Sequence, residues 1–274
     1  MPLLAILVGL VVAVSCLVPD APAQAVDRWA RSQLPVHAGS ALVIAGAQSG
    51  FAHGTDQDCT AGPVLKGTGL IANLSQYQRA VRFVAIPKHC GGRGPRGVFA
   101  GGTEIGSIIW ESPDADLAII RVEPRTTTSP VCHTGSWASG CSLVSHYEQR
   151  ASGDVFIATN RNGQELALPV TGTKTPSDRE FFCISGSKSG ARCTWENVAR
   201  PPLFRVGSHE LVAETYRGNL AHGDSGAPVF GRDRKIIGMA IGVGEENEDF
   251  ATYTAYIPIG YVLAEQPYYA VATD

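Results

Sequence analysis

The sequence has few charged residues and no strong excess of either sign. Asp, Glu, Lys and Arg make up 17% of its 274 residues, and the formal net charge is -3. This balance provides no basic surface for nucleic acid, so we expect no such partner. The sequence also has no CxxC pair and no HExxH motif, and we therefore expect no metal site. It contains no internal repeat or low-complexity tract.

The N-terminal 25 residues are typical of a secretory signal peptide. An apolar run from Leu3 to Val18 is followed by small residues, and Ala23-Gln-Ala25 fits a cleavage site. The run is slightly shorter than the roughly 20 residues of a spanning helix. No Lys or Arg precedes it, so a retained anchor or lipidation at Cys16 remain alternatives. We expect cleavage after Ala25, a secreted, periplasmic or cell-envelope location, and no stable membrane span afterwards.

The cysteines agree with export. Of the seven, Cys16 lies in the signal, and the remaining six form an even set that predicts three disulfides. Sequence alone permits 15 connectivities for six cysteines. We favour the sequential one, because it closes short loops in a chain rich in hairpins: Cys59–Cys90, Cys132–Cys141 and Cys183–Cys193.

Short runs of β-forming residues dominate the secondary-structure pattern. They are separated by Gly, Pro, Asn, Asp and Ser at hairpin spacing, and Asn162-Gly163 is a strong hairpin turn signal. Only residues 26–33 and the last dozen residues have a helical pattern. The Pro- and Thr-rich stretch 123–130 is the best candidate for a linker between two halves. The expected strands cover residues 40–45, 82–86, 106–110, 117–122, 154–158 and 165–170.

Residues 223–226 read Gly-Asp-Ser-Gly, which fits a nucleophile loop. A serine hydroxyl attacks well only when a base removes its proton. Gly223 would let its own N–H and that of Ser225 converge on an oxyanion, and Gly226 leaves room beside the hydroxyl. A surface turn is the plain alternative, since these residue types are common in turns. The strand-like sequence that follows favours an active site.

A histidine and an aspartate precede Ser225 in settings suited to a catalytic triad. His89 ends a β-rich run and directly precedes Cys90, so a disulfide would fix its backbone. Asp116 opens an apolar strand that would draw its carboxylate inward, where it can orient the imidazole. Asp114 is the second choice, more typical of a solvated turn after Pro113.

These motifs resemble those of chymotrypsin-fold serine proteases, and most closely the secreted bacterial streptogrisin and α-lytic protease group. The likeness extends from about residue 40 to residue 265, and is loose over 150–179. The segments that carry it are Cys59-Thr-Ala-Gly62 with His89-Cys90, Asp116-Leu-Ala-Ile-Ile120, the cysteine loop 183–193, Gly223-Asp-Ser-Gly-Ala-Pro228 and the closing stretch 252–259.

The resemblance implies an all-β fold of two six-stranded antiparallel β-barrels with the active site in the cleft between them, followed by a short C-terminal helix. It implies peptide-bond hydrolysis through an acyl-enzyme, with a protein or peptide substrate and no cofactor. We expect a monomer. The domains implied are a signal peptide at 1–25, an N-terminal segment at 26–39, a first barrel at 40–125, a second barrel at 126–265 and a C-terminal tail at 266–274.

The same resemblance assigns substrate-binding positions. Substrate would lie as an extended strand along Ile241, Gly242 and Val243. Asn219 aligns near the floor of the specificity pocket, and with Val243 it favours a small or medium apolar side chain. His222 adjoins the oxyanion glycine and is the remaining candidate contact.

Several residues depart from the group's pattern. Ile86-Pro87-Lys88 replaces small residues before the histidine, and Ile241 replaces a serine that supports the triad aspartate. Ile184 replaces an arginine, so Asp224 needs another partner, for which we consider Lys188 or Arg192. These departures keep open an inactive protease homologue acting as a secreted binding or regulatory module. An esterase is a third possibility, opposed by the lack of a Gly-x-Ser-x-Gly elbow in a βαβ context.

Overall fold

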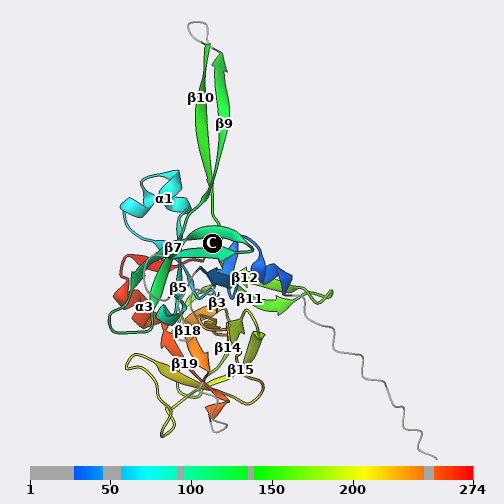
Figure 1. Ribbon diagram of the computed structural model, residues 1–274, viewed down its shortest axis with the longest axis vertical. Helices are drawn as coiled ribbons and strands as arrows, with labels where there is room; N and C mark the ends of the chain where they lie inside the picture. Colours follow the sequence, from blue (N-terminus) through cyan, green and yellow to red (C-terminus); the bar gives the residue numbers. More distant parts are fainter. Residues whose placement is uncertain (1–27, 46–56, 92–95, 135–138, 244–249, 274) are drawn as a thin grey trace, which may run out of the picture.

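The computed structural model describes residues 28–45, 57–91, 96–134, 139–243 and 250–273. The expected signal peptide, its cleavage site and Cys16 lie outside these residues. Most of the described chain is β-strand, arranged as two barrel-like sheets with a long hairpin extending away from them (Figure 1). Among the described helices, none has the length and apolar character needed to cross a membrane.

The first barrel is an eight-stranded sheet in the order β20-β4-β5-β8-β7-β6-β2-β3. Strands β3 and β4 lie near its opposite ends, yet only three residues separate them along the chain. Four Cα steps span at most about 14 Å, so the sheet must curl until its ends meet. The strands are β2 (Ala41–Ile44), β3 (Gln57–Thr60), β4 (Val64–Gly67), β5 (Arg82–Ile86), β6 (Gly97–Ala100), β7 (Thr103–Glu111), β8 (Ala118–Val122) and β20 (Tyr269–Val271).

The second barrel is a closed ring of six strands. Strand β18 pairs with both β17 and β19, which closes the order β18-β17-β14-β15-β16-β19, and short β13 adds to β18 in parallel. Trp195, Phe182 and Tyr256 fill the interior and are fully buried. The strands are β13 (Gly172–Thr173), β14 (Phe181–Gly186), β15 (Gly190–Val198), β16 (Leu211–Thr215), β17 (Pro228–Phe230), β18 (Lys235–Val243) and β19 (Tyr253–Pro258).

Two smaller sheets lie outside the barrels. Strands β9 (Arg125–Thr134) and β10 (Ser139–Glu148) pair with each other along ten residues and form the protruding hairpin (Figure 1). Strand β11 (Ala151–Thr159) pairs with β12 (Glu165–Pro169) and, in parallel, with β1 (Val36–Ala38). The second pairing attaches the N-terminal segment to the middle of the chain.

The helices are few and short. They are the 3-10 turns η1 (Trp29–Ser32) and η2 (Ile71–Asn73), and the α-helices α1 (Gln76–Ala80), α2 (Lys88–Gly91) and α3 (Ile259–Glu265). Helix α3 is the short C-terminal helix that we expected, although it begins before the last dozen residues. Of the last dozen residues, 263–265 belong to α3, but the helical pattern is wrong for residues 269–271, which form β20 and pair with β4.

The expected strands at 82–86 and 117–122 are confirmed as β5 and β8, and Asn162-Gly163 lies in the turn between β11 and β12. The prediction that residues 123–130 form a linker is wrong, because most of this stretch belongs to strand β9, which begins at Arg125. β-branched threonines at 126–128 favour a strand. The described part of the expected 26–33 helix forms only the single 3-10 turn η1. The domain boundaries at residues 39, 125 and 265 stay predictions.

Three disulfides join Cys59 to Cys90, Cys132 to Cys141 and Cys183 to Cys193. This is the sequential connectivity favoured by the sequence. The first pair ties β3 to α2 in the first barrel, the second links facing residues of the β9–β10 hairpin, and the third ties β14 to β15.

Candidate active site

Helix α2 places His89 at the end of a buried strand. β5 runs through the first barrel to Ile86, and the chain then turns at Pro87, whose carbonyl accepts a hydrogen bond from Cys90 N at 3.1 Å. The Cys59–Cys90 disulfide holds the next residue against β3. The imidazole is therefore carried on a fixed backbone, and its side chain remains 42% exposed.

Asp116 binds His89 through both carboxylate oxygens. Its Oδ2 lies 2.5 Å from His89 Nδ1, and its Oδ1 accepts a hydrogen bond from the His89 backbone N–H at 2.8 Å. The residue stands just before β8, in a turn closed by the bond from Ser112 N to Leu117 O. Asp114, the second choice, is exposed, and its backbone N–H donates to Ser112 Oγ. The structure therefore brings together the pair that sequence analysis preferred.

The pKa of Asp116 is lowered from its usual value of 3.8. Partial burial alone would raise the pKa, because it disfavours the charged carboxylate. The hydrogen bonds and charge of His89, with a further contribution from the charge of Lys88, outweigh burial and keep Asp116 ionised. An ionised carboxylate at Nδ1 holds the imidazole with Nε2 free to accept a proton.

Lys88 does not occupy the cleft beside the imidazole. Its Nζ donates to Ser112 O at 2.6 Å, which anchors the ammonium on the turn that leads to Asp116. Lys88, which departs from the pattern of the resembled proteases, thus acts on the Asp116 carboxylate of the His89–Asp116 pair. It favours the ionised form of Asp116.

Ser225 lies in a loop fixed from two sides. Its carbonyl accepts a hydrogen bond from Thr60 N in the first barrel at 2.8 Å, and Gly226 N donates to Ala240 O in the second barrel at 2.8 Å. Gly226 has φ +96°, and a Cβ there would lie 2.1 Å from Thr60 O. Only glycine allows this close approach, so Gly226 is required for the contact between the barrels.

A cleft of about 320 Å³ brings Ser225 and His89 to one surface. Its other lining residues are Leu220, Ala221, His222, Asp224, Ile241 and Gly242. Three of the five expected substrate-binding residues, His222, Ile241 and Gly242, therefore border it. Asn219 is exposed and does not line it, whereas its buried neighbour Leu220 does. Only the backbone of Val243 is described, as the last residue of β18.

The Ser225 hydroxyl is not hydrogen-bonded to His89 within the described residues. Such bonds are often long in unliganded sites and tighten only around substrate. Both residues line the same cleft.

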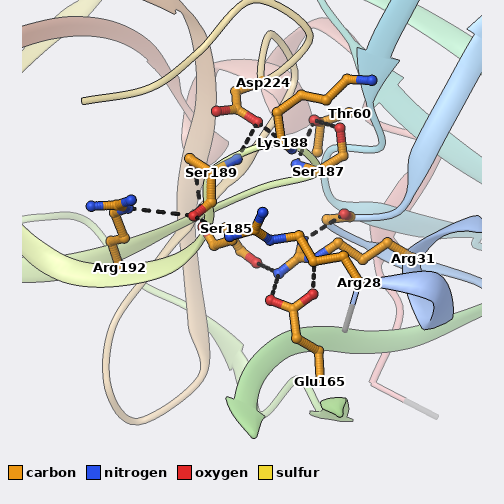
Figure 2. A network of polar contacts seen from close by, with 12 residues as sticks. Arg28, Arg31, Thr60, Glu165, Ser185, Ser187, Lys188, Ser189, Arg192 and Asp224 are labelled. Carbon is orange, nitrogen blue, oxygen red and sulfur yellow. Dashed lines mark hydrogen bonds and ion pairs between the residues drawn. The ribbon is translucent and has the colours of Figure 1, made fainter. Parts of the chain in front are cut away.

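Asp224 is fully buried and its carboxylate is held by backbone amides (Figure 2). Oδ1 accepts hydrogen bonds from Lys188 N at 2.8 Å and Ser189 N at 3.2 Å, and Oδ2 accepts one from Ala221 N at 2.8 Å. Neither side-chain cation that we considered pairs with it. Lys188 Nζ binds Asp58 at 2.7 Å, and Arg192 Nε donates to Ser189 O at 3.4 Å.

The two expected oxyanion-hole amides flank Asp224. Within the described residues, no oxygen accepts a hydrogen bond from Gly223 N or Ser225 N. The Gly223 carbonyl, unlike its N–H, has hydrogen-bond partners. Thr60 Oγ1 donates to its oxygen at 2.7 Å, and Ser187 Oγ lies 3.2 Å from it. Sequence reasoning missed Thr60 and Ser187. Thr60 is the residue after a paired cysteine, which is the one available signal.

A second grouping of serine, histidine and aspartate lies away from the cleft. Ser152 Oγ contacts His37 Nδ1 at 2.7 Å and donates to Asp154 Oδ2 at 2.8 Å. Burial lowers the pKa of His37, and Asp154 partly opposes this shift. Because one ring nitrogen faces both partners, this grouping does not form the relay order of a triad. The described residues hold no group of three or more His, Cys, Asp or Glu suited to a metal ion.

The fold is similar to solved structures of serine proteases. Protease A of Thermobifida fusca has 17% identity and a TM-score of 0.52, covering 84% of this chain and 98% of that one. Cellulomonas bogoriensis chymotrypsin has 16% identity and a TM-score of 0.52, covering 87% and 100%. A glutamic-acid-specific serine protease that uses a histidine triad in substrate binding has 16% identity and a TM-score of 0.54, covering 86% and 100%.

No family model matches this sequence, and no curated protein matches it either. At 16–18% identity, the structural likeness defines the chymotrypsin-like double-barrel fold. The class of protein is thus established at the level of fold, and the activity has to be argued from the site.

Proposed function

We propose that this protein is a secreted serine endopeptidase. The observation that carries the proposal is the His89–Asp116 pair, with Oδ2 2.5 Å from Nδ1, whose histidine lines a cleft together with Ser225. A nucleophile, a base and a group that orients the base are the parts that acyl transfer needs.

In the proposed reaction, Ser225 Oγ attacks the peptide carbonyl while His89 Nε2 takes the hydroxyl proton. The N–H groups of Gly223 and Ser225 stabilise the oxyanion of the tetrahedral intermediate. His89 then donates its proton to the leaving amine, and the carbonyl carbon stays bonded to Ser225 as an ester. Water repeats the sequence with His89 as base and releases the acid product. Asp116 stabilises the imidazolium in both halves.

The substrate side chain is proposed to be small or medium and apolar. Leu220 and Ile241 provide apolar walls in a cleft of about 320 Å³. The aspartate in the lining, Asp224, has its carboxylate turned onto three backbone N–H groups. It is not free to pair with a Lys or Arg side chain, which disfavours trypsin-like specificity.

An inactive homologue that binds a partner is the second candidate. Two observations favour it: Ser225 lacks a hydrogen bond to His89 within the described residues, and Ile241 provides no hydroxyl for Asp116. Among the described residues, Asp116 then depends on His89 alone for its side-chain hydrogen bonds.

Fluorophosphonate labelling decides between the candidates, because it requires an activated serine. The full chain is expressed for export, with disulfides formed, beside Ser225→Ala and His89→Ala. Ser152→Ala serves as the matched control, since Ser152 also contacts a histidine and an aspartate. We expect labelling of the wild type and of Ser152→Ala, and none of the other two.

Folded wild-type protein that does not label would contradict an active enzyme and favour the binding module. If the protein labels, turnover of peptides compared with simple esters separates a peptidase from an esterase. Mass analysis of the exported chain tests cleavage after Ala25.

A further inference from the structure

Arg31 is an almost fully buried arginine, and it lies outside the cleft. It is 1% exposed and belongs to η1, in the N-terminal segment. Its Nε and Nη2 donate to the two carboxylate oxygens of Glu165 at 2.5 and 2.9 Å. Nη2 also donates to Ser185 Oγ at 2.9 Å, and Nη1 donates to Gly39 O at 2.7 Å. Its guanidinium lies 4.6 Å from the centroid of the Phe156 ring.

This contact set joins distant parts of the chain. Glu165 lies on β12 and Ser185 on β14, which are 134 and 154 residues from Arg31. A buried ion pair contributes little net stability, because desolvation offsets the attraction, but its geometry can specify how elements are arranged. The fork of the guanidinium fixes the direction of two carboxylate oxygens at once. The ion pair thus sets where η1 lies relative to β12, and the hydrogen bond to Ser185 extends this arrangement to β14.

The end of β14 leads directly to Asp224. Gly186 follows Ser185, and a Cβ at Gly186 would lie 2.2 Å from Asp224 Oδ1. The next turn donates the N–H groups of Lys188 and Ser189 to the same oxygen. The carbonyl of Ser189 in turn accepts a hydrogen bond from Arg28 at 3.3 Å. Figure 2 shows the two groups of contacts side by side: Arg31 is bonded to Ser185, and Lys188 and Ser189, which follow along the chain, are bonded to Asp224.

We infer that Arg31 is a positioning residue for the oxyanion-hole amides of Gly223 and Ser225. Arg31 holds Ser185, Ser185 leads into the turn 187–189, and that turn grips the carboxylate of the residue between the two amides. The N-terminal segment thereby takes part in assembling the nucleophile loop without touching substrate. This inference rests on the proposed function for its catalytic consequence.

Simple removal of Arg31 is a poor test, because Glu165 would be left buried and unpaired and the protein could unfold. The double variant Arg31→Met/Glu165→Met removes both charges and keeps side-chain volume. Arg31→Lys keeps the charge but loses the fork. Arg150→Met is the matched control: Arg150 binds the carbonyls of Glu104, Ile105 and Glu123, all remote from Asp224.

The first readout is steady-state turnover of a peptide substrate. For the double variant we expect kcat to fall by about 10- to 100-fold with KM within about twofold of wild type, since the amides act mainly in the transition state. Arg31→Lys should recover part of this loss, and Arg150→Met should keep wild-type kcat. Wild-type kcat in a folded double variant, or a rise in KM alone, would overturn the inference.

The second readout is hydrogen exchange of a peptide that covers residues 218–226, and it does not require activity. The double variant should exchange faster than wild type in this segment, and Arg150→Met should not. If the wild type labels no serine, the proposed function fails while exchange still tests the positioning role. Unchanged exchange over 218–226 in the double variant would overturn that role.

Discussion

The two halves of the candidate site are built in opposite ways. In the first barrel, His89 and Asp116 hold each other by direct hydrogen bonds, and their side chains remain 42% and 26% exposed. In the second barrel, Asp224 is fully buried and is bonded to three backbone N–H groups, and Ser225 is fixed through its main chain.

The difference follows from which groups must change charge. In the proposed reaction His89 gains and loses a proton, so it needs contact with the cleft and a partner that stabilises its cation. Asp224 takes no part in the proposed proton transfer. A carboxyl group can be buried when N–H donors replace the water around it, and it then fixes the surrounding backbone. In the proposed reaction, the first half would transfer the proton, and the second half would hold the nucleophile loop in place.

The largest effect is expected from the first half. Asp116→Asn removes the carboxylate that orients His89, and kcat for a peptide substrate should fall by about 10⁴-fold. Asp114→Asn is the control, because the Asp114 side chain is exposed and only its backbone N–H contacts Ser112. Equal activity of both variants and wild type would mean that Asp116 does not act in catalysis.

The second half is tested by steric displacement. Gly186→Ala places a Cβ 2.2 Å from Asp224 Oδ1, so the carboxylate must move and the amides beside it lose their direction. We expect kcat to fall by about 100-fold, the cost of losing one oxyanion donor. Gly260→Ala, whose Cβ would meet nothing within 4 Å, should keep wild-type kcat. A fully active Gly186→Ala would show that the site tolerates a displaced Asp224.

The contact between the halves is tested at Thr60. Thr60→Val keeps the shape but removes the hydroxyl, which donates to Gly223 O at 2.7 Å and accepts a hydrogen bond from Ser187 N at 3.0 Å. One neutral hydrogen bond is worth about 1 kcal/mol, so fluorophosphonate labelling should slow by about five- to tenfold. Thr60→Ser retains the donor and should label at nearly the wild-type rate. A Thr60→Val rate equal to that of Thr60→Ser would count against the role of this bond.

The smallest effect concerns pH. The pKa of Asp116 is lowered in the folded protein, so ionised Asp116 contributes stability above its usual pKa of 3.8. That contribution is lost as the pH falls through the lower folded pKa. The difference in thermal midpoint between wild type and Asp116→Asn should be constant near neutral pH and shrink below pH 3.8. A difference that does not change with pH would contradict the lowered pKa.

Much of the fold and half of the site could be predicted from local sequence. β5 coincides with the expected run 82–86, since alternating turn signals and β-forming residues mark strands locally. The partners of Asp224 could not be predicted, because they are main-chain N–H groups that any residue would provide. Strand β20 could not be predicted either, because it is defined by its pairing with β4, a segment about 200 residues away along the chain.

The sequence by itself determined the chemistry available to this protein: the Gly-Asp-Ser-Gly loop, a histidine beside a cysteine and an aspartate before an apolar strand. These signals are local, because they depend on residue types within a few positions. Tertiary structure alone decided that Asp224 is held by amides, that Thr60 fixes the Gly223 carbonyl and that Arg31 joins the N-terminal segment to β14. Each of these contacts forms between segments distant in sequence, where burial and close packing select the partner.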